Sequence, residues 1–211
     1  TFGMENTAAI TAVRDIAKSI APDQVSGTIS TDLEQIAYGS TFNLTGTFKL
    51  PDKTPIPSLN VRFEIKGANE TTWRSLAAGV TDPAGVISIP VVVGQKSEIR
   101  LVSDASWERS EGKTAEKTIS VIPKIQLDLP ASMKVNSTYQ ISGQLLPRIS
   151  DIKVTVKQNA KAVAEVVTDA NGSFTFNAKV ATAGLATFQV VFPAGVKNSA
   201  GASDEITVLV R

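Results

Sequence analysis

The stretch YGSTFNLTGT at residues 38–47 recurs as VNSTYQISGQ at residues 135–144. Apolar and polar residues alternate in both copies, and Gly46 and Gly143 occupy the same place. Alternation with a period of two is typical of a β-strand that has one buried face and one solvent-exposed face. The chain therefore contains two copies of one β-rich unit.

The correspondence between the copies extends well beyond these ten residues. The motif Thr81-Asp82-x-x-Gly85 matches Thr168-Asp169-x-x-Gly172, and order and spacing are kept through many turns with small insertions. The further pairs are Leu59 with Ile152, Val61 with Val154, Phe63 with Val156, Ile87 with Phe174, Ile89 with Phe176, Ile99 with Phe188, Leu101 with Val190, Ile119 with Ile206, and Val121 with Val208. We interpret this pattern as a tandem duplication.

The composition narrows the classes of function. The 211 residues carry 21 basic and 20 acidic side chains, interspersed without long runs, so nothing favours nucleic acid as a partner. No apolar run is long enough to cross a bilayer. There is no cysteine and no histidine, which excludes disulfides, thiol nucleophiles, the usual zinc sites and every imidazole-based triad. We expect no catalytic residue.

Both copies predict a two-sheet antiparallel sandwich of immunoglobulin type, because each has seven short alternating strands with turns between them. The expected strands are 27–33, 42–48, 61–65, 72–78, 87–91, 99–101 and 119–121, then 124–129, 138–145, 152–158, 162–167, 173–179, 186–192 and 205–210. Pro123 separates the copies with almost no linker, so we expect limited bending between them. The expected sandwiches are residues 25–122 and 123–211, after an N-terminal segment of residues 1–24.

That N-terminal segment has a helical period from Glu5 to Ala21. Its apolar stripe is formed by Ala9, Val13, Ile16 and Ile20, and Pro22 ends it. The helix is interpreted as a linker, as the tail of a preceding domain, as a strut on the first sandwich, or as an assembly element that binds protein partners or copies of the same chain. Thr1 is not an initiator methionine, and we expect a mature product or a fragment.

Three kinds of residue are candidates for binding. Asp82 and Asp169 open turns, and hairpin geometry explains them more simply than half of a calcium site, which needs about six to eight oxygen ligands. Trp73 and Trp107 occur only in the first copy and are candidate platforms for stacking on sugars. For both we favour packing, Trp73 in a short edge strand and Trp107 as a lid over the end of the core. We expect no metal and no cofactor.

These features together resemble the tandem immunoglobulin-like repeats of bacterial surface and secreted proteins. The resemblance rests on Tyr38-Gly39 before a strand that contains Leu44 and Gly46, on Trp73, on Thr81-Asp82 with Gly85, and on Ile119-Ser120-Val121. The second copy is more divergent, because it has Val135-Asn136 in place of Tyr-Gly and no tryptophan.

The resemblance implies a protein outside the cell or at its surface, and it leaves several functions open. One is a stiff, non-catalytic structural or adhesive spacer in a surface layer, stalk or filament. The second is a carbohydrate-binding accessory module for cell-surface polysaccharide. The third is the C-terminal region of a larger secreted enzyme whose catalytic domain lies upstream.

Overall fold

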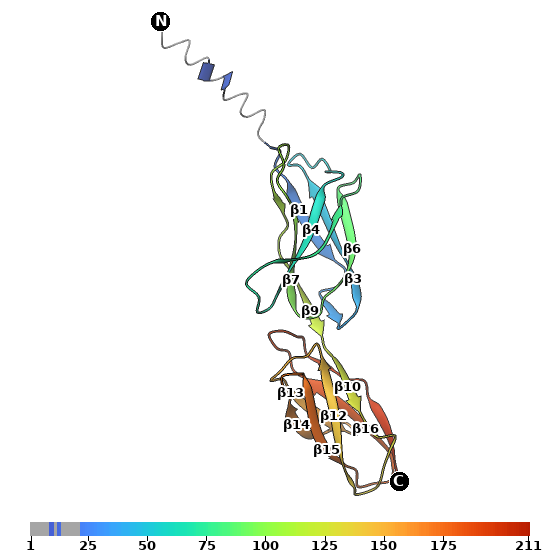
Figure 1. Cartoon of the computed structure of the whole chain (residues 1–211). Helices are drawn as coiled ribbons and strands as arrows, with labels where there is room; N and C mark the ends of the chain where they lie inside the picture. The colour runs from blue at the N-terminus through green and yellow to red at the C-terminus, as the bar shows by residue number, and fades with distance from the viewer. Residues whose placement is uncertain (1–8, 11, 14–21) are drawn as a thin grey trace.

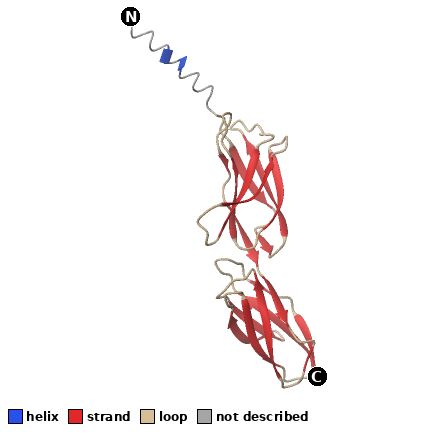
Figure 2. Ribbon diagram, viewed as in Figure 1, coloured by secondary structure: helices blue, strands red, loops and turns tan. Residues whose placement is uncertain are grey.

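A computed structural model describes residues 9–10, 12–13 and 22–211 and shows two β-sandwiches joined end to end (Figures 1 and 2). Almost all of the regular structure in the described part is β-strand. The predicted pair of antiparallel sandwiches is therefore confirmed. Each sandwich has its own buried apolar cluster, and the two clusters share no residue.

The first sandwich packs a three-stranded sheet against a six-stranded one. The smaller sheet has the order β1-β3-β6, and the larger has the order β2-β9-β7-β4-β5 with β8 paired to β7. Only the β2–β9 pair is parallel among these strands. The bounds are β1 Ser26–Thr31, β2 Gln35–Ala37, β3 Thr41–Lys49, β4 Asn60–Gly67, β5 Arg74–Val80, β6 Val86–Val92, β7 Ser97–Ser103, β8 Gly112–Lys113 and β9 Lys117–Ile122.

The second sandwich repeats this topology strand for strand. Its sheets have the orders β10-β12-β15 and β11-β18-β16-β13-β14, with β17 paired to β16. The bounds are β10 Lys124–Asp128, β11 Ser132–Met133, β12 Thr138–Leu146, β13 Lys153–Gln158, β14 Lys161–Val167, β15 Ser173–Lys179, β16 Gly184–Phe192, β17 Gly201–Ala202 and β18 Ile206–Val210. The seven strands expected in each copy are present, and β2, β8, β11 and β17 are short additions that the sequence pattern did not predict.

The alternation of side chains explains how each strand covers the core. In β3 the residues Phe42, Leu44 and Phe48 are buried, and the polar residues between them face outward. Burial of one large apolar side chain stabilises the fold by about 1.5–3 kcal/mol. Because every second residue of a strand points to the same face, the sequence pattern alone selects the buried face.

The strand pairing corrects one part of the proposed alignment. Ser97 pairs with Ile119 in the first sandwich, and the equivalent residue Ala186 pairs with Val208 in the second. Ile119 is therefore equivalent to Val208, and not to Ile206 as we expected. A shift of two residues keeps every side chain on the same face of a strand, so the periodicity of the sequence could not detect it.

The Thr-Asp-x-x-Gly motifs form equivalent hairpin turns. The Oδ1 atom of Asp82 accepts hydrogen bonds from the backbone N–H groups of Ala84 and Val86, at 2.8 and 2.9 Å. Asp169 does the same with Asn171 and Ser173, at 2.8 and 2.9 Å. The glycines that end the two turns have positive φ angles of 72° and 69°. These contacts confirm the turn interpretation of the motif.

The predicted helix at Glu5–Ala21 lies mostly outside the described residues. Residues 9–10 and 12–13 are described and helical. Ile10 is 51% exposed and Val13 is 65% exposed. Ile16 and Ile20, which complete the predicted apolar stripe, fall outside the described part. The helix as a whole therefore stays a prediction. In the described residues, no helix is long and apolar enough to cross a membrane.

Candidate functional site: the junction between the sandwiches

The feature that distinguishes this molecule from two separate sandwiches is the junction between them. Strand β9 ends at Ile122 and strand β10 begins at Lys124, so Pro123 alone separates them. Proline restricts its own φ angle and also restricts the residue before it. The covalent connection between the two sandwiches is therefore short and stiff.

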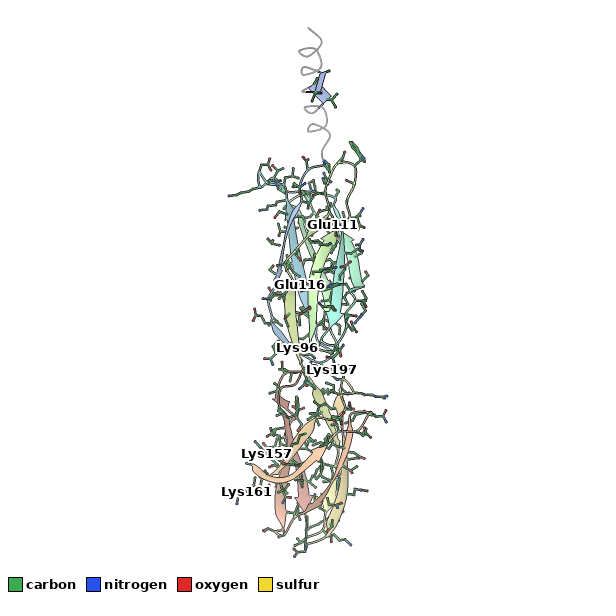
Figure 3. All side chains as sticks on the ribbon, turned by 90° about the vertical axis from the view of Figure 1, so that its left-hand side faces the viewer. Lys96, Glu111, Glu116, Lys157, Lys161 and Lys197 are labelled. Atoms are coloured by element: carbon green, nitrogen blue, oxygen red, sulfur yellow. The ribbon has the colours of Figure 1, made fainter. Side chains whose placement is uncertain are left out.

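A loop of the second sandwich adds hydrogen bonds across the junction. The backbone N–H of Ser199 donates to the carbonyl oxygen of Val121 at 2.9 Å, and the N–H of Lys96 donates to the carbonyl oxygen of Lys197 at 2.9 Å. Lys96 and Lys197 lie close together at the junction in Figure 3. A Cβ atom added to Gly201 would come within 2.7 Å of the Cγ2 atom of Ile122, so these residues pack closely. The loop at residues 193–200 thus binds the end of the first sandwich.

The loop at residues 193–200 contains one buried side-chain amide, that of Asn198. Asn198 is buried, and its Nδ2 atom donates to the carbonyl oxygens of Pro193 and Ser199 at 3.0 and 2.8 Å. The N–H of Gly195 donates to the Asn198 carbonyl oxygen at 3.0 Å. These bonds join Pro193, Gly195, Asn198 and Ser199 within the loop, next to the bond from Ser199 to Val121.

Two hollows flank the junction, each lined by residues from both sandwiches. The larger has a volume of about 540 Å³ and is lined by Lys66, Gly67, Ala68, Glu70, Lys96, Ser97, Glu98, Thr118 and Val196. The smaller, of about 330 Å³, is lined by Tyr38, Ile65, Arg74, Leu76, Val92, Val93, Gly94, Gln95, Ser97 and Pro147. Only Val196 and Pro147 come from the second sandwich.

The carboxylates of the larger hollow already have partners. Glu98 forms an ion pair with Lys66 at 2.6 Å, and hydrogen bonding to Glu98 raises the pKa of Lys66 above its ordinary value. Glu70 accepts a hydrogen bond from the N–H of Gly67 at 2.9 Å. Both contacts stabilise the local structure beside the junction.

Trp73 lies immediately before β5, and not within a strand as we expected. The ring is half-buried, with Lys66 Nζ 4.8 Å and Arg100 Cζ 4.2 Å from its centroid. Arg100 also donates to Glu64 at 2.9 Å. Cation–π contacts of this kind contribute roughly 0.5–1 kcal/mol each at exposed sites. In this structure Trp73 packs on charged residues of the outer face of β4 and β7.

Trp107 does not cover the core, so the expected lid is wrong. The side chain is 85% exposed in the loop between β7 and β8. The loop itself is ordered by Ser106, whose hydroxyl accepts hydrogen bonds from the N–H groups of Glu108 and Arg109 at 3.2 and 3.1 Å. Trp107 is therefore presented to solvent at the N-terminal end of the first sandwich, far along the molecule from the junction.

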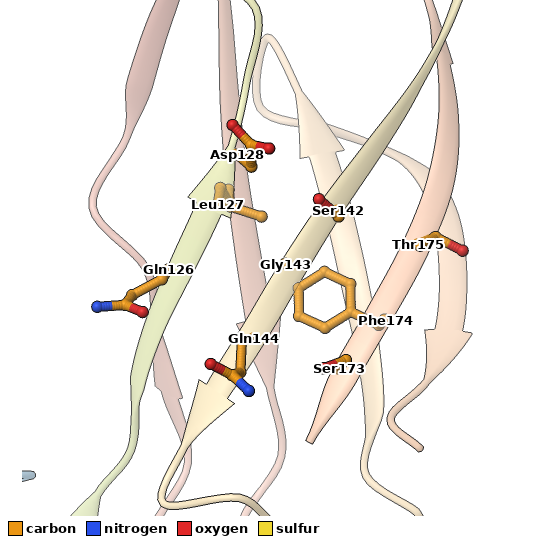
Figure 4. Close-up of a pocket in the computed structure, with 9 residues that line it drawn as sticks. All are labelled: Gln126, Leu127, Asp128, Ser142, Gly143, Gln144, Ser173, Phe174 and Thr175. Carbon is orange, nitrogen blue, oxygen red and sulfur yellow. The ribbon is translucent and has the colours of Figure 1, made fainter. Parts of the chain in front are cut away.

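A third hollow lies on the small sheet of the second sandwich (Figure 4). It has a volume of about 410 Å³ and is lined by Gln126, Leu127, Asp128, Ser142, Gly143, Gln144, Ser173, Phe174 and Thr175. Asp128 is its only charged residue. No group of three or more acidic residues in the described ranges is placed to hold a metal ion.

The residues that bind the two sandwiches together were not identified individually from the sequence. Lys96, Lys197 and Ser199 act through backbone groups, which carry no signature in a single sequence. The available signal was the position of Pro123 directly between two strand patterns, and it indicated a close junction without naming the loop that completes it.

Comparisons with known proteins give structural neighbours only. No family model matches the chain, and no curated protein matches its sequence. The fibronectin(III)-like modules of Clostridium thermocellum CbhA are 15% identical, cover 87% of this chain and 93% of their own, and give a TM-score of 0.30. A C-terminal intimin fragment, in complex with the intimin-binding domain of its translocated receptor, is 14% identical. The match covers 86% of this chain and 62% of the fragment, with a TM-score of 0.44. The Yersinia pseudotuberculosis adhesin InvE is 11% identical. The match covers 86% of this chain and 58% of the InvE chain, with a TM-score of 0.39.

Proposed function

We propose that this chain is a non-catalytic structural or adhesive module that holds two immunoglobulin-like sandwiches in line as a stiff spacer. The junction is the observation that supports the proposal. There, a one-residue linker and two backbone hydrogen bonds of the loop 193–200 both restrict movement between the sandwiches. A flexible tether between domains would need several free residues. We place the module outside the cell, in a bacterial surface layer, stalk or filament, where it binds protein partners and needs no cofactor.

The stiffness can be measured with spin labels, because the chain has no native cysteine. Asn43 and Gln140 are exposed and occupy equivalent positions on β3 and β12. Labels on Asn43→Cys and Gln140→Cys should give a narrow distance distribution in dilute protein. Insertion of Gly-Ser-Gly-Ser after Pro123 should broaden it, because the insertion separates the loop 193–200 from Val121. A native distribution as broad as that of the insertion variant would contradict the proposal.

A second candidate function is the binding of cell-surface polysaccharide, and the exposure of Trp107 favours it. The test is quenching of tryptophan fluorescence by polysaccharide in the native chain and in the Trp107→Ala and Trp73→Ala variants. Quenching that Trp107→Ala abolishes and Trp73→Ala preserves would support this function. Fluorescence that polysaccharide leaves unchanged in the native chain would exclude it and leave the spacer role.

A further inference from the structure

Each side of the junction has an equivalent at one of the two outer ends of the pair of sandwiches. Lys96 precedes Ser97 at the base of the first sandwich, and its equivalent Leu185 precedes Ala186 at the base of the second. On the other side of the junction, the pairing Val102 with Lys113 matches the pairing Val191 with Ala202. This register makes Trp107 the equivalent of Val196. Lys96 and Val196 line the same hollow at the junction.

The residues at the outer ends that are equivalent to Val196 and Lys96 are large, apolar and exposed. Trp107 is 85% exposed and Leu185 is 73% exposed, which makes them the two most exposed large hydrophobic side chains of the described residues. Leu185 also pairs with Leu209 on the neighbouring strand, and Leu209 is itself 46% exposed. Trp107 lies at the N-terminal end of the first sandwich and Leu185 at the C-terminal end of the second. Each end therefore presents a large apolar side chain that a partner could cover.

The base of the second sandwich also has a hollow that resembles one at the junction. It has a volume of about 600 Å³ and is lined by Ser132, Met133, Lys134, Val135, Tyr139 and Arg211. Val135 corresponds to Tyr38, which lines the smaller hollow at the junction together with Pro147 of the second sandwich. The base of the second sandwich therefore has an open counterpart of a surface that is in use within the chain.

The two outer ends of the pair of sandwiches differ in charge. The base of the second sandwich, at residues 129–137, 179–185 and 209–211, carries Lys134, Lys179 and Arg211 and no acidic side chain. The loops of the other end, the adjoining strand end and their ion-pair partners carry six carboxylates and five cations: Asp23, Asp52, Asp82, Asp104, Glu108 and Glu111 against Lys49, Lys53, Arg62, Arg109 and Lys113. The base of the second sandwich is thus basic and the other end has a small acidic excess, and this difference in charge favours contact between the two ends.

The N-terminal end differs from the junction in one respect. Asp23 occupies the place of Val121, because its carbonyl oxygen accepts the N–H of Ser110 at 2.8 Å as Val121 accepts the N–H of Ser199. Its own N–H donates to the carbonyl oxygen of Glu108 at 2.8 Å. The backbone groups used at the internal junction are therefore already bonded in the first sandwich. A partner at this end must bind through side chains, and its binding is weaker than the internal contact.

We propose that the base of the second sandwich of one molecule docks on the N-terminal end of the first sandwich of another, with Trp107 facing Leu185. This end-to-end contact extends the internal junction into a chain of sandwiches. The inference rests on the proposed structural role and names a second copy of this chain as the partner. Because the contact is heterologous, repeated docking produces filaments and not closed dimers.

The first test uses introduced cysteines in the full chain, which has none of its own. Ala105 and Ala183 are exposed and lie two residues from Trp107 and Leu185, so cysteines at these positions keep both contact residues. Ala105→Cys and Ala183→Cys variants are mixed under mild oxidation, and the mixed disulfide is followed on non-reducing gels. The control mixes Ala105→Cys with Val163→Cys, because Val163 is exposed on the edge strand β14, away from both ends. The Ala105–Ala183 pair should form the mixed disulfide about tenfold faster or more, since docking raises the effective thiol concentration. Equal rates in both mixtures would overturn the proposal.

The second test is sedimentation velocity of the full chain at low salt and at concentrations up to about 1 mM. The native chain should associate. Leu185→Lys, which gives the second sandwich the residue that the first has at position 96, should weaken association about tenfold or more. Val163→Lys should leave it unchanged.

Two outcomes of sedimentation would refute end-to-end docking: a native chain that stays monomeric throughout, or association that Leu185→Lys does not weaken. The second outcome would assign association to another segment, such as the predicted N-terminal helix. Neither outcome bears on the stiffness of the spacer, which the spin-label distances measure separately in dilute protein.

Discussion

Gly46 and Gly143 lie in the middle of β3 and β12, where glycine ordinarily weakens a strand. A Cβ atom at Gly46 would come within 2.9 Å of Leu101 Cδ1. At Gly143 it would come within 2.7 Å of Phe174 Cε2 and 2.9 Å of Leu127 Cδ2. Figure 4 shows the Phe174 ring beside Gly143. Close packing of side chains explains both glycines, because the strand register is continuous at these positions.

Gly143→Ala should therefore destabilise the second sandwich by about 1–3 kcal/mol, because the new methyl group overpacks the contact with Phe174. The measurement is chemical denaturation of the variant and of the native chain. Gly94→Ala is the matched control, since nothing lies within 4 Å of a Cβ atom added there. A Gly143→Ala variant as stable as the native chain would show that Phe174 moves aside without cost.

The strands of each sandwich enclose a separate core. Phe174 and Phe176 of β15 belong to the cluster of the second sandwich, and Ile87 of β6 belongs to that of the first. The contacts across the junction are backbone hydrogen bonds and close packing of Ile122 on Gly201. The two cores should thus unfold as separate cooperative units, although we propose that the junction between them is stiff.

Phe176→Ala tests this independence. Phe176 is buried, so its removal leaves a cavity and should destabilise the second sandwich by about 3–5 kcal/mol. Calorimetry should show the transition of the second sandwich moving to lower temperature while that of the first stays in place. If both transitions moved together by the same amount, the sandwiches would form one coupled unit.

Across the described part of the molecule, several acidic side chains act in turns and ion pairs. Asp82 and Asp169 cap turns, Glu64 pairs with Arg100, and Glu34 pairs with Lys117 at 2.6 Å, which lowers the pKa of Glu34. A bound calcium ion needs several oxygen ligands around one point. The elongated arrangement of two sandwiches instead depends on Pro123 and the loop 193–200.

The melting temperature should consequently be the same, to within about 1 °C, in calcium at about 10 mM and in EDTA. Calcium bound specifically to the folded state would raise it by mass action. A rise of several degrees that Asp82→Asn or Asp169→Asn removes would establish a calcium site at that turn and contradict the expectation.

The sequence by itself determined the duplication, the β class, the two-sandwich architecture and the buried face of each long strand. These properties follow from the alternation of residues such as Phe42, Leu44 and Phe48, because a strand places every second side chain on the same face. The Asp82 and Asp169 turns were also predictable, since their hydrogen bonds join residues only two to four positions apart.

The tertiary structure decided the register of β18, the exposure of Trp107, the cations around Trp73, and the loop that completes the junction. Each depends on contacts between residues far apart in the chain, such as Ser199 with Val121. A period of two is unchanged by a shift of two residues, so it cannot set a register. A backbone hydrogen bond uses groups that nearly every residue has, so only the folded chain shows which pairs form.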